Sequence, residues 1–378
     1  MTRLRKVPSS ARGGTVRPAA AGAAAAALAT GRQTGAEPPK DLAGALEKIP
    51  AKDLDTAVQV CKELIAGGAG TVKRLIDLVG DEFGDAAGVK PKYALHGVVI
   101  YAGRPKADAE RKMVARTLAR ELASGRSAEA KAFLCRQLQL CGGSAEVPAL
   151  AGLLRDNRLC EPATQALLAI GGKGPAAALR AALPKATGKR RATIIKALGR
   201  LRDKPSASMV RWAASDADQD VRLMAWYALG NMGVAEAGEH LVKAAGDKAG
   251  FERTQAADAA LRLARRLAQE GSAVEAGRLC RQLLADAKGP ERFQQRCAAL
   301  HGLATALGVK AVGDVMAALE ADELKYRIPA ARTAVKLAKS IHGDHPTEAR
   351  KLLRKVLKAT GEKAVLRQAE TLLAKAGK

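Results

Sequence analysis

The sequence predicts an all-α superhelix, a solenoid of about ten stacked helical hairpins. Hydrophobic residues make up 48% of the 378 residues but aromatic residues only 3%, so alanine and leucine supply most of the apolar surface. No run of β-branched residues is long enough to build a sheet, and Val98-Val99-Ile100-Tyr101 is best interpreted as the end of a buried helix. Helical segments also recur along the chain at a nearly constant spacing, which is typical of a repeat array.

The repeat is clearest in the middle of the chain. Four segments that end the second helix of a hairpin begin with Ala166, Ala197, Ala228 and Ala260, at spacings of 31, 31 and 32 residues. Thirty-one residues are enough for two helices of about 11 residues and two short turns. One hairpin cannot cover its own apolar stripe, so several units must stack. The first helices of these four units are predicted at residues 147–154, 176–183, 207–214 and 238–245.

Less regular hairpins extend the array on both sides. An N-terminal hairpin is predicted from Asp41 to Ala66. The other predicted pairs are Thr71–Phe83 with Lys92–Ala102, Ala107–Ser124 with Ala128–Cys141, Val274–Ala287 with Arg292–Leu307, Ala311–Ala321 with Arg327–Ser340, and Glu348–Ala359 with Glu362–Ala374. The chain is therefore expected to divide into an N-terminal segment (1–36), N-terminal hairpins (37–144), regular repeats (145–270) and C-terminal hairpins (271–378).

One unit resembles a known repeat family. Asp216-Ala217-Asp218-Gln219-Asp220-Val221-Arg222, followed by Ala225 and Ala228-Leu229-Gly230, resembles the HEAT family in its short form of about 30 residues, which is also found in bilin lyases. The resemblance covers residues 145–270 and implies a ladder between neighbouring repeats. In that ladder the turn residues Asp216, Asp218 and Asp220, together with Val221, precede Arg222 early in the second helix. The preceding unit carries Gly188-Lys189-Arg190-Arg191 instead. The hairpin at 274–307 looks more like a tetratricopeptide pair.

The N-terminus has two interpretations. Basic residues up to Arg17 precede the alanine-rich stretch Ala19 to Ala29, in which Ala27-Leu28-Ala29 fits a signal cleavage pattern. A disordered tail rich in alanine and arginine explains the same composition. The protein is therefore exported to the periplasm or cell envelope, or it stays in the cytoplasm. No transmembrane segment is expected in the folded region.

The chain is strongly basic, with a net charge of +25 and a pI near 10.1. Residues 1–36 hold six basic residues and no acid, which leaves +19 of the +25 for the rest of the chain. Such a field attracts nucleic acid, anionic lipid or acidic proteins without choosing among them. Two basic helix faces are candidate polyanion-binding rows, although a solvated face that keeps the solenoid soluble is the simpler explanation. The rows are Lys189, Lys196 and Arg200, and Lys351, Arg354, Lys355 and Lys358.

No catalytic, metal or cofactor site is expected. The six cysteines lack a C-x-x-C pair, and most lie within apolar helical stretches, as small core residues do. His342-Gly343-Asp344-His345 forms a turn with too few ligands for a metal site. Trp212, Trp226 and Tyr227 are interpreted as residues of the core or of the concave face.

The sequence favours a non-enzymatic scaffold that binds a protein partner through the row of second helices. Binding of nucleic acid or another polyanion by the basic rows is the alternative hypothesis. A lyase-like enzyme or accessory subunit is a third hypothesis.

Overall fold

The structure is a computed structural model that describes residues 42–80 and 88–376. Every regular element in these ranges is helical, which confirms the predicted all-α solenoid. The chain forms two compact units whose boundary lies between Ala149 and Leu150, within helix α8 (Val147–Gly152). We describe each unit by itself. The four-part division predicted from the sequence stays a prediction.

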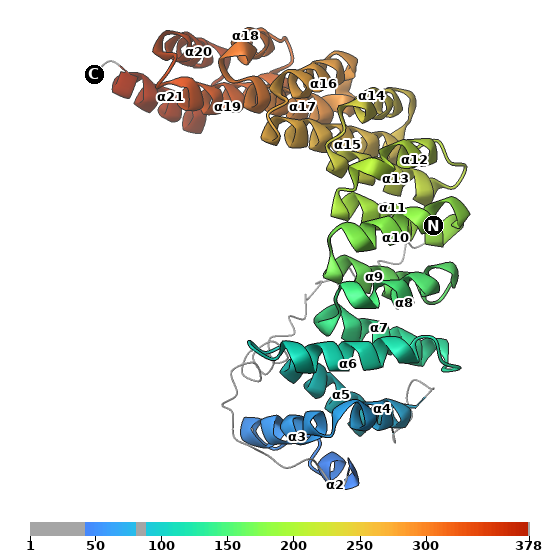
Figure 1. The fold of residues 1–378 in the computed structure, drawn as a ribbon. Coiled ribbons are helices and arrows are strands. Elements are labelled where there is room, and N and C mark those ends of the chain that lie inside the picture. Colours follow the sequence, from blue (N-terminus) through green and yellow to red (C-terminus); the bar gives the residue numbers. More distant parts are fainter. Residues whose placement is uncertain (1–41, 81–87, 377–378) are drawn as a thin grey trace, which may run out of the picture. The chain divides into compact units, whose positions relative to one another are not determined.

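Unit 1 consists of consecutive helical hairpins. Its helices are α2 (Leu42–Glu47), α3 (Leu54–Ala66), α4 (Gly68–Leu78), α5 (Val89–Ala102), α6 (Asp108–Glu121) and α7 (Ala128–Cys141), followed by the 3-10 turn η2 (Ser144–Glu146) (Figure 1). The second helices α3, α5 and α7 pack against one another in order. Val98 and Val99 are fully buried in α5, so this apolar run is the end of a buried helix as predicted. Helix α4 ends at Leu78 rather than at the predicted Phe83, because Gly80 adopts a φ of 77° that ends a helix.

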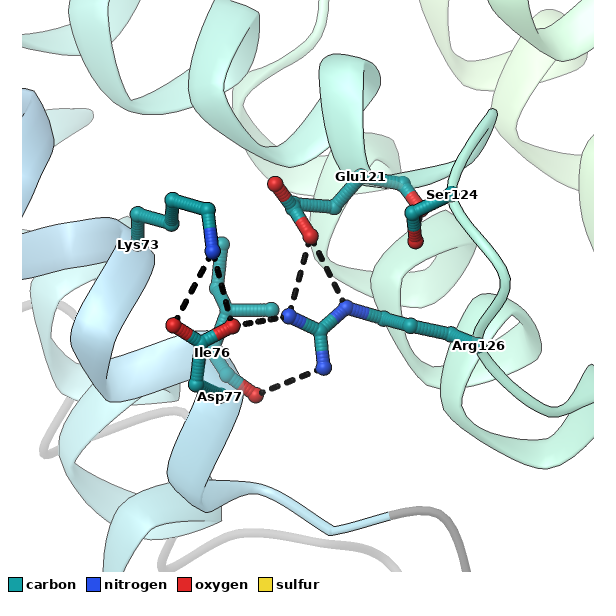
Figure 2. Close-up of polar contacts among 6 residues, drawn as sticks. All are labelled: Lys73, Ile76, Asp77, Glu121, Ser124 and Arg126. Atoms are coloured by element: carbon teal, nitrogen blue, oxygen red, sulfur yellow. Dashed lines mark hydrogen bonds and ion pairs between the residues drawn. The ribbon is translucent and has the colours of Figure 1, made fainter.

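Arg126 ties three elements of unit 1 together. It lies in the loop between α6 and α7, and its side chain is only 14% exposed. Figure 2 shows its guanidinium between Glu121 of α6, at 2.9–3.0 Å from the Glu121 carboxylate, and Asp77 of α4, which also pairs with Lys73 at 3.0 Å. A third nitrogen, Nη1, donates to the carbonyl of Ile76. One arginine thereby fixes the spacing of two neighbouring hairpins.

Unit 2 continues the same alternation of first and second helices. Its α-helices are α9 (Cys160–Ile170), α10 (Lys173–Ala182), α11 (Gly188–Leu201), α12 (Ala207–Ala213), α13 (Gln219–Met232), α14 (Gly238–Asp247), α15 (Gly250–Gln269), α16 (Ala273–Asp286), α17 (Phe293–Leu307), α18 (Val312–Leu319), α19 (Leu324–Ile341), α20 (Pro346–Ala359) and α21 (Lys363–Ala376). Short 3-10 turns lead into or follow several first helices, as in η3 (Leu153–Arg155) after α8.

The second helices of unit 2 form one continuous layer. Helices α9, α11, α13, α15, α17, α19 and α21 each contact the next, and the first helices lie on the other side. At the C-terminal end, Figure 1 shows α18 and α20 on one side and α19 and α21 on the other. We call the row from α9 to α21 the second-helix layer.

Two glycines set the close approach of helices in this layer. A Cβ atom on Gly199 of α11 would lie 2.5 Å from the Cα of Ala228 in α13. A Cβ on Gly230 of α13 would lie 2.7 Å from the carbonyl oxygen of Ala259 in α15. No Cβ fits at either position without moving backbone, so glycine is required for this spacing.

The three aromatic residues of the third regular repeat, Trp212, Trp226 and Tyr227, differ in how deeply they are buried. Trp226 is 2% exposed in the core of α13. Tyr227 is half-buried, with the guanidinium carbon of Arg262 4.9 Å from its ring centroid. Trp212, predicted to belong to the core or concave face, lies on the first helix α12 and is 80% exposed. Trp212 is therefore not a core residue, because Val210 and Ala213 form the buried side of this short helix.

One stretch of the described chain, Pro290–Leu319, is long and apolar enough to cross a membrane by length and composition. It spans α17 and α18 and is interrupted at Gly308, where φ is 55°. Core helices pass the same test, so this is weak evidence for a membrane span. The predicted signal-like segment, residues 1–36, lies outside the described residues.

Candidate functional site

The first basic row lies on the second-helix layer. Lys189, Lys196 and Arg200 are exposed along α11. Within residues 42–80 and 88–376, none of the three side chains makes an ion pair or hydrogen bond. The opposite side of α11 carries Ile194 and Leu198, which are fully buried. The row is therefore a set of uncompensated charges held on a well-packed helix.

The second basic row lies on the opposite side of unit 2. Helix α20 is a first helix, so the structure does not bring this row together with the α11 row. Lys351 pairs with Glu348 at 2.8 Å, and Lys355 pairs with Glu320, which follows α18. Arg354 and Lys358 are exposed and make no such pair within the described chain. Half of this row is thus neutralised by its neighbours.

The turn before α13 is built by its aspartates. Asp218 is the N-cap residue, and its side chain accepts from the backbone N–H of Asp220 at 2.9 Å. Asp216 accepts from the N–H of Asp218 at 3.0 Å, and its other oxygen lies 2.6 Å from Nη1 of Arg191 on α11. Val221, the last of the predicted turn residues, is fully buried. The turn is therefore joined to the preceding repeat.

Arg222 makes the next link in the same direction. Its Nη1 donates to the carbonyls of Asp216 and Ala217, both at 2.8 Å, and its Nε lies 3.1 Å from the carboxylate of Glu252 on α15. The side chains of Arg222 and Glu252 are only 16% and 17% exposed.

Comparable ion pairs join later second helices. They are Arg296 with Glu323, at the start of α19, and Arg332 with Glu362, just before α21. We call the four pairs, including Arg191–Asp216 and Arg222–Glu252, the arginine ladder. Sequence reasoning found the Asp216–Arg222 segment. It did not find any of the four pairs, because the acidic partners are 25 to 30 residues away from the arginines.

A groove between α19 and α21 is lined by four cationic side chains. It has a volume of about 520 Å³. No acidic residue lines it, and within the described chain none of its four cations has an ion-pair partner. We call it the α19–α21 groove. Its lining residues are Val335, Lys336, Lys339, Arg367, Gln368, Thr371, Leu372 and Lys375.

The sequence analysis did not predict the groove, although the spacing of basic residues along α19 and α21 indicates a basic face on each helix. Lys336 and Lys339 are three residues apart on α19, and Arg367, Thr371 and Lys375 follow one another at four-residue steps on α21. Such spacings place side chains on one helix face. The spacing within each helix does not show that the basic face of α19 lies next to the basic face of α21 in the fold.

The positive field extends from the groove to the neighbouring second helices. Burial lowers the pKa of His301 on α17, and the charges of Lys336 on α19 and Arg265 on α15 lower it further. The two helices on either side of α17 in the layer, α15 and α19, therefore each place a cation within electrostatic reach of this histidine. The imidazole is held toward its neutral form in the absence of an anion.

The described residues offer little to support catalysis or metal binding. Burial raises the pKa of the thiols of Cys61, Cys135, Cys141 and Cys280 to about 12, so these groups are poor nucleophiles. All six cysteines are free thiols. In residues 42–80 and 88–376 no group of three or more His, Cys, Asp or Glu side chains could hold a metal ion.

The repeats also match known proteins. The family model for HEAT repeats matches residues 176–262, which span α10 to α15 and include the links made by Arg191 and Arg222. Residues 176–262 are therefore HEAT-like repeats within the α-solenoid. A search of curated protein sequences gave no match.

Among solved structures, this HEAT-like solenoid is similar to karyopherins. The karyopherin Kap121p bound to the extreme C-terminus of the protein phosphatase Cdc14p has a TM-score of 0.51 and 10% identity. Kap121p in another crystal structure has a TM-score of 0.50 and 11% identity. Both comparisons cover 88% of this chain and 43% of the karyopherin, so the chain spans less than half of its length. At such identity the likeness shows the fold alone.

Proposed function

We propose that this protein is a non-enzymatic scaffold whose second-helix layer in unit 2 binds an acidic partner protein. The observation that carries the proposal is the distribution of unpaired cations. Within the described chain, many cationic side chains on α11, α15, α19 and α21 have no ion-pair partner, and the proposal uses eight of them. They are Lys189, Lys196, Arg200, Arg265, Lys336, Lys339, Arg367 and Lys375.

The layer supports this use for a structural reason. Stacked second helices give a continuous surface on which each repeat adds a few contacts. The arginine ladder and the buried glycine contacts hold the helices in place without using these eight cations. The similar karyopherin Kap121p is bound to the C-terminus of another protein, and this supports binding of a polypeptide by such a fold.

Nucleic-acid binding is the second candidate because of the net charge of +25. Phosphate contacts would make such binding strongly salt-dependent. The hypothesis of a lyase-like enzyme or accessory subunit has no set of described residues to support it, and we do not propose it.

Fluorescence anisotropy with the full-length chain tests the proposal. A labelled poly-glutamate peptide and a labelled DNA duplex are titrated from about 50 mM to about 200 mM salt. We expect the peptide to bind more tightly than the duplex. Replacing Lys189, Lys196 and Arg200 by glutamine should weaken peptide binding about three- to tenfold. The matched control replaces Lys351, Arg354 and Lys358 on α20 and should change the affinity less than about twofold.

Two outcomes would count against this function. Tighter binding of the duplex, with an affinity that falls steeply with salt, would replace it by the nucleic-acid hypothesis. Absence of peptide binding at the lowest salt concentration would contradict the proposal that the partner is an acidic protein.

A further inference from the structure

The α19–α21 groove brings four positive charges together, and no acidic side chain in its lining neutralises them. Lys336 and Lys339 come from α19, and Arg367 and Lys375 come from α21. No carboxylate lines the groove, whereas the ladder arginine Arg332 of α19 is paired with Glu362. Like charges that face one recess repel one another, and an anion placed among them removes that repulsion. The recess is therefore electrostatically suited to a ligand with several negative charges.

The chain itself does not supply such a ligand in its N-terminal segment. Residues 1–36 contain six basic residues and no acidic one, so this segment is repelled by the groove. A second copy of the chain carries +25 and is disfavoured for the same reason. Charge complementarity requires a different, acidic molecule.

The size and the lining of the groove narrow the class of ligand. A volume of about 520 Å³ lies within the range of sites that enclose a small ligand or a few side chains. Val335 and Leu372 add apolar surface, and the amide of Gln368 has no partner within the described chain. Proteins that bind single-stranded nucleic acid stack its bases on aromatic side chains, and no lining residue is aromatic. Charge, apolar surface and an amide together fit a peptide better than a sugar-phosphate chain.

The geometry points to the α19–α21 groove as the recognition site for a short linear segment of a partner protein that carries about four negative charges beside one apolar side chain. This inference rests on the proposed scaffold function. It adds which chemical groups the partner presents to the α19–α21 groove. Arg367 is the residue suited to clamp a carboxylate or phosphate through two parallel N–H bonds. Lys336, Lys339 and Lys375 act as point charges, and the apolar side chain of the segment covers Val335 and Leu372.

The test measures binding of labelled ten-residue peptides to the full-length chain. One peptide carries four glutamates and a leucine, a second carries two phosphoserines in place of the glutamates, and a third carries glutamines instead. Replacing Lys336, Lys339, Arg367 and Lys375 by glutamine should weaken binding of the charged peptides at least about thirtyfold, because each exposed ion pair contributes a factor of several. The four α20 residues Lys351, Arg354, Lys355 and Lys358, replaced together, are the control that loses the same formal charge.

A second variant keeps all four cations. Gln368→Glu places one carboxylate in the groove and should weaken both charged peptides about tenfold while leaving the melting temperature unchanged or raised. Preference for the glutamate peptide over the phosphoserine peptide identifies carboxylates as the natural ligand groups, and the reverse preference identifies phosphate. Either result supports the groove, provided that the glutamine peptide does not bind.

Three outcomes would overturn the inference, and they separate it from the scaffold function. Unchanged affinity in the groove variant, with loss in the α11 triple variant, would remove the groove and keep the scaffold. Equal or tighter binding of a single-stranded oligonucleotide that competes with the peptide would reassign the groove to nucleic acid. Binding of neither charged peptide by the wild-type chain would remove both proposals.

Discussion

The arginine ladder and the α19–α21 groove are both built from basic side chains on second helices, and α19 contributes to both, yet their surroundings differ. Each ladder arginine lies against a carboxylate of the next repeat, as Arg222 does with Glu252. The groove residues, such as Arg367, face no carboxylate. The ladder uses charge to join repeats, whereas the groove leaves charge available to a ligand. The difference shows that the number of basic residues on a helix does not locate a binding surface, because the acidic groups opposite them decide it.

The largest expected effect comes from breaking the ladder. Arg222→Met removes the pair with Glu252 and leaves the carbonyls of Asp216 and Ala217 without their donor. Glu252 then keeps only the longer 3.9 Å contact with Lys248. We expect a loss of about 2–4 kcal/mol in the free energy of unfolding, because removing one partner strands a half-buried charge.

Urea denaturation measures this loss, with Arg354→Met as an exposed control that should change stability by less than about 0.5 kcal/mol. Peptide affinity should be unchanged in the folded variant. A loss no larger than that of the control would show that the ladder does not stabilise the array.

A smaller effect is expected from removing the acidic partners of the α20 cations, so that these cations are unpaired like those of the groove. The double variant Glu320→Gln and Glu348→Gln frees Lys355 and Lys351 from their acidic partners. We expect the glutamate peptide to bind about two- to threefold more tightly, with stability changed by less than about 1 kcal/mol because exposed ion pairs contribute little. Anisotropy titration checks the gain. If the affinity stays at the wild-type value, pairing is not what distinguishes the two faces.

The smallest effect concerns pH. The folded-state pKa of His301 lies below its ordinary value of 6.5, so the unfolded state binds more protons in the window between the two pKa values. Stability should therefore rise with pH through that window, and His301→Gln should flatten the slope. Melting temperatures at about pH 5.5 and about pH 7.5 measure the difference between the two proteins. An identical slope in the variant would contradict the prediction.

Much of the architecture could be predicted from the sequence because it depends on local periodicity. The recurrence at Ala166, Ala197 and Ala228 reflects where second helices end, since α9, α11 and α13 each end four residues later, whereas α15 continues past Ala260 to Gln269. The limit of α4 was missed because Gly80, and not the apolar pattern, ends that helix.

The candidate site could be predicted only in part. The α11 row follows from one helix, and the structure leaves it exposed. The α20 row also follows from one helix, but the partner of Lys355 is Glu320, 35 residues earlier, and no helical period shows that pair. The groove needs α19 and α21 to meet with like-charged faces. Such properties depend on which helices become neighbours, which local patterns do not specify.

The two glycine contacts have a consequence for how the array changes length. Gly199 and Gly230 are 31 residues apart, and so are their contacts Ala228 and Ala259. The same close approach of a glycine to an alanine of the next second helix therefore recurs after one unit of 31 residues. A copied 31-residue cassette would meet a compatible neighbour at each end, so tandem duplication can lengthen this protein without inventing a new interface.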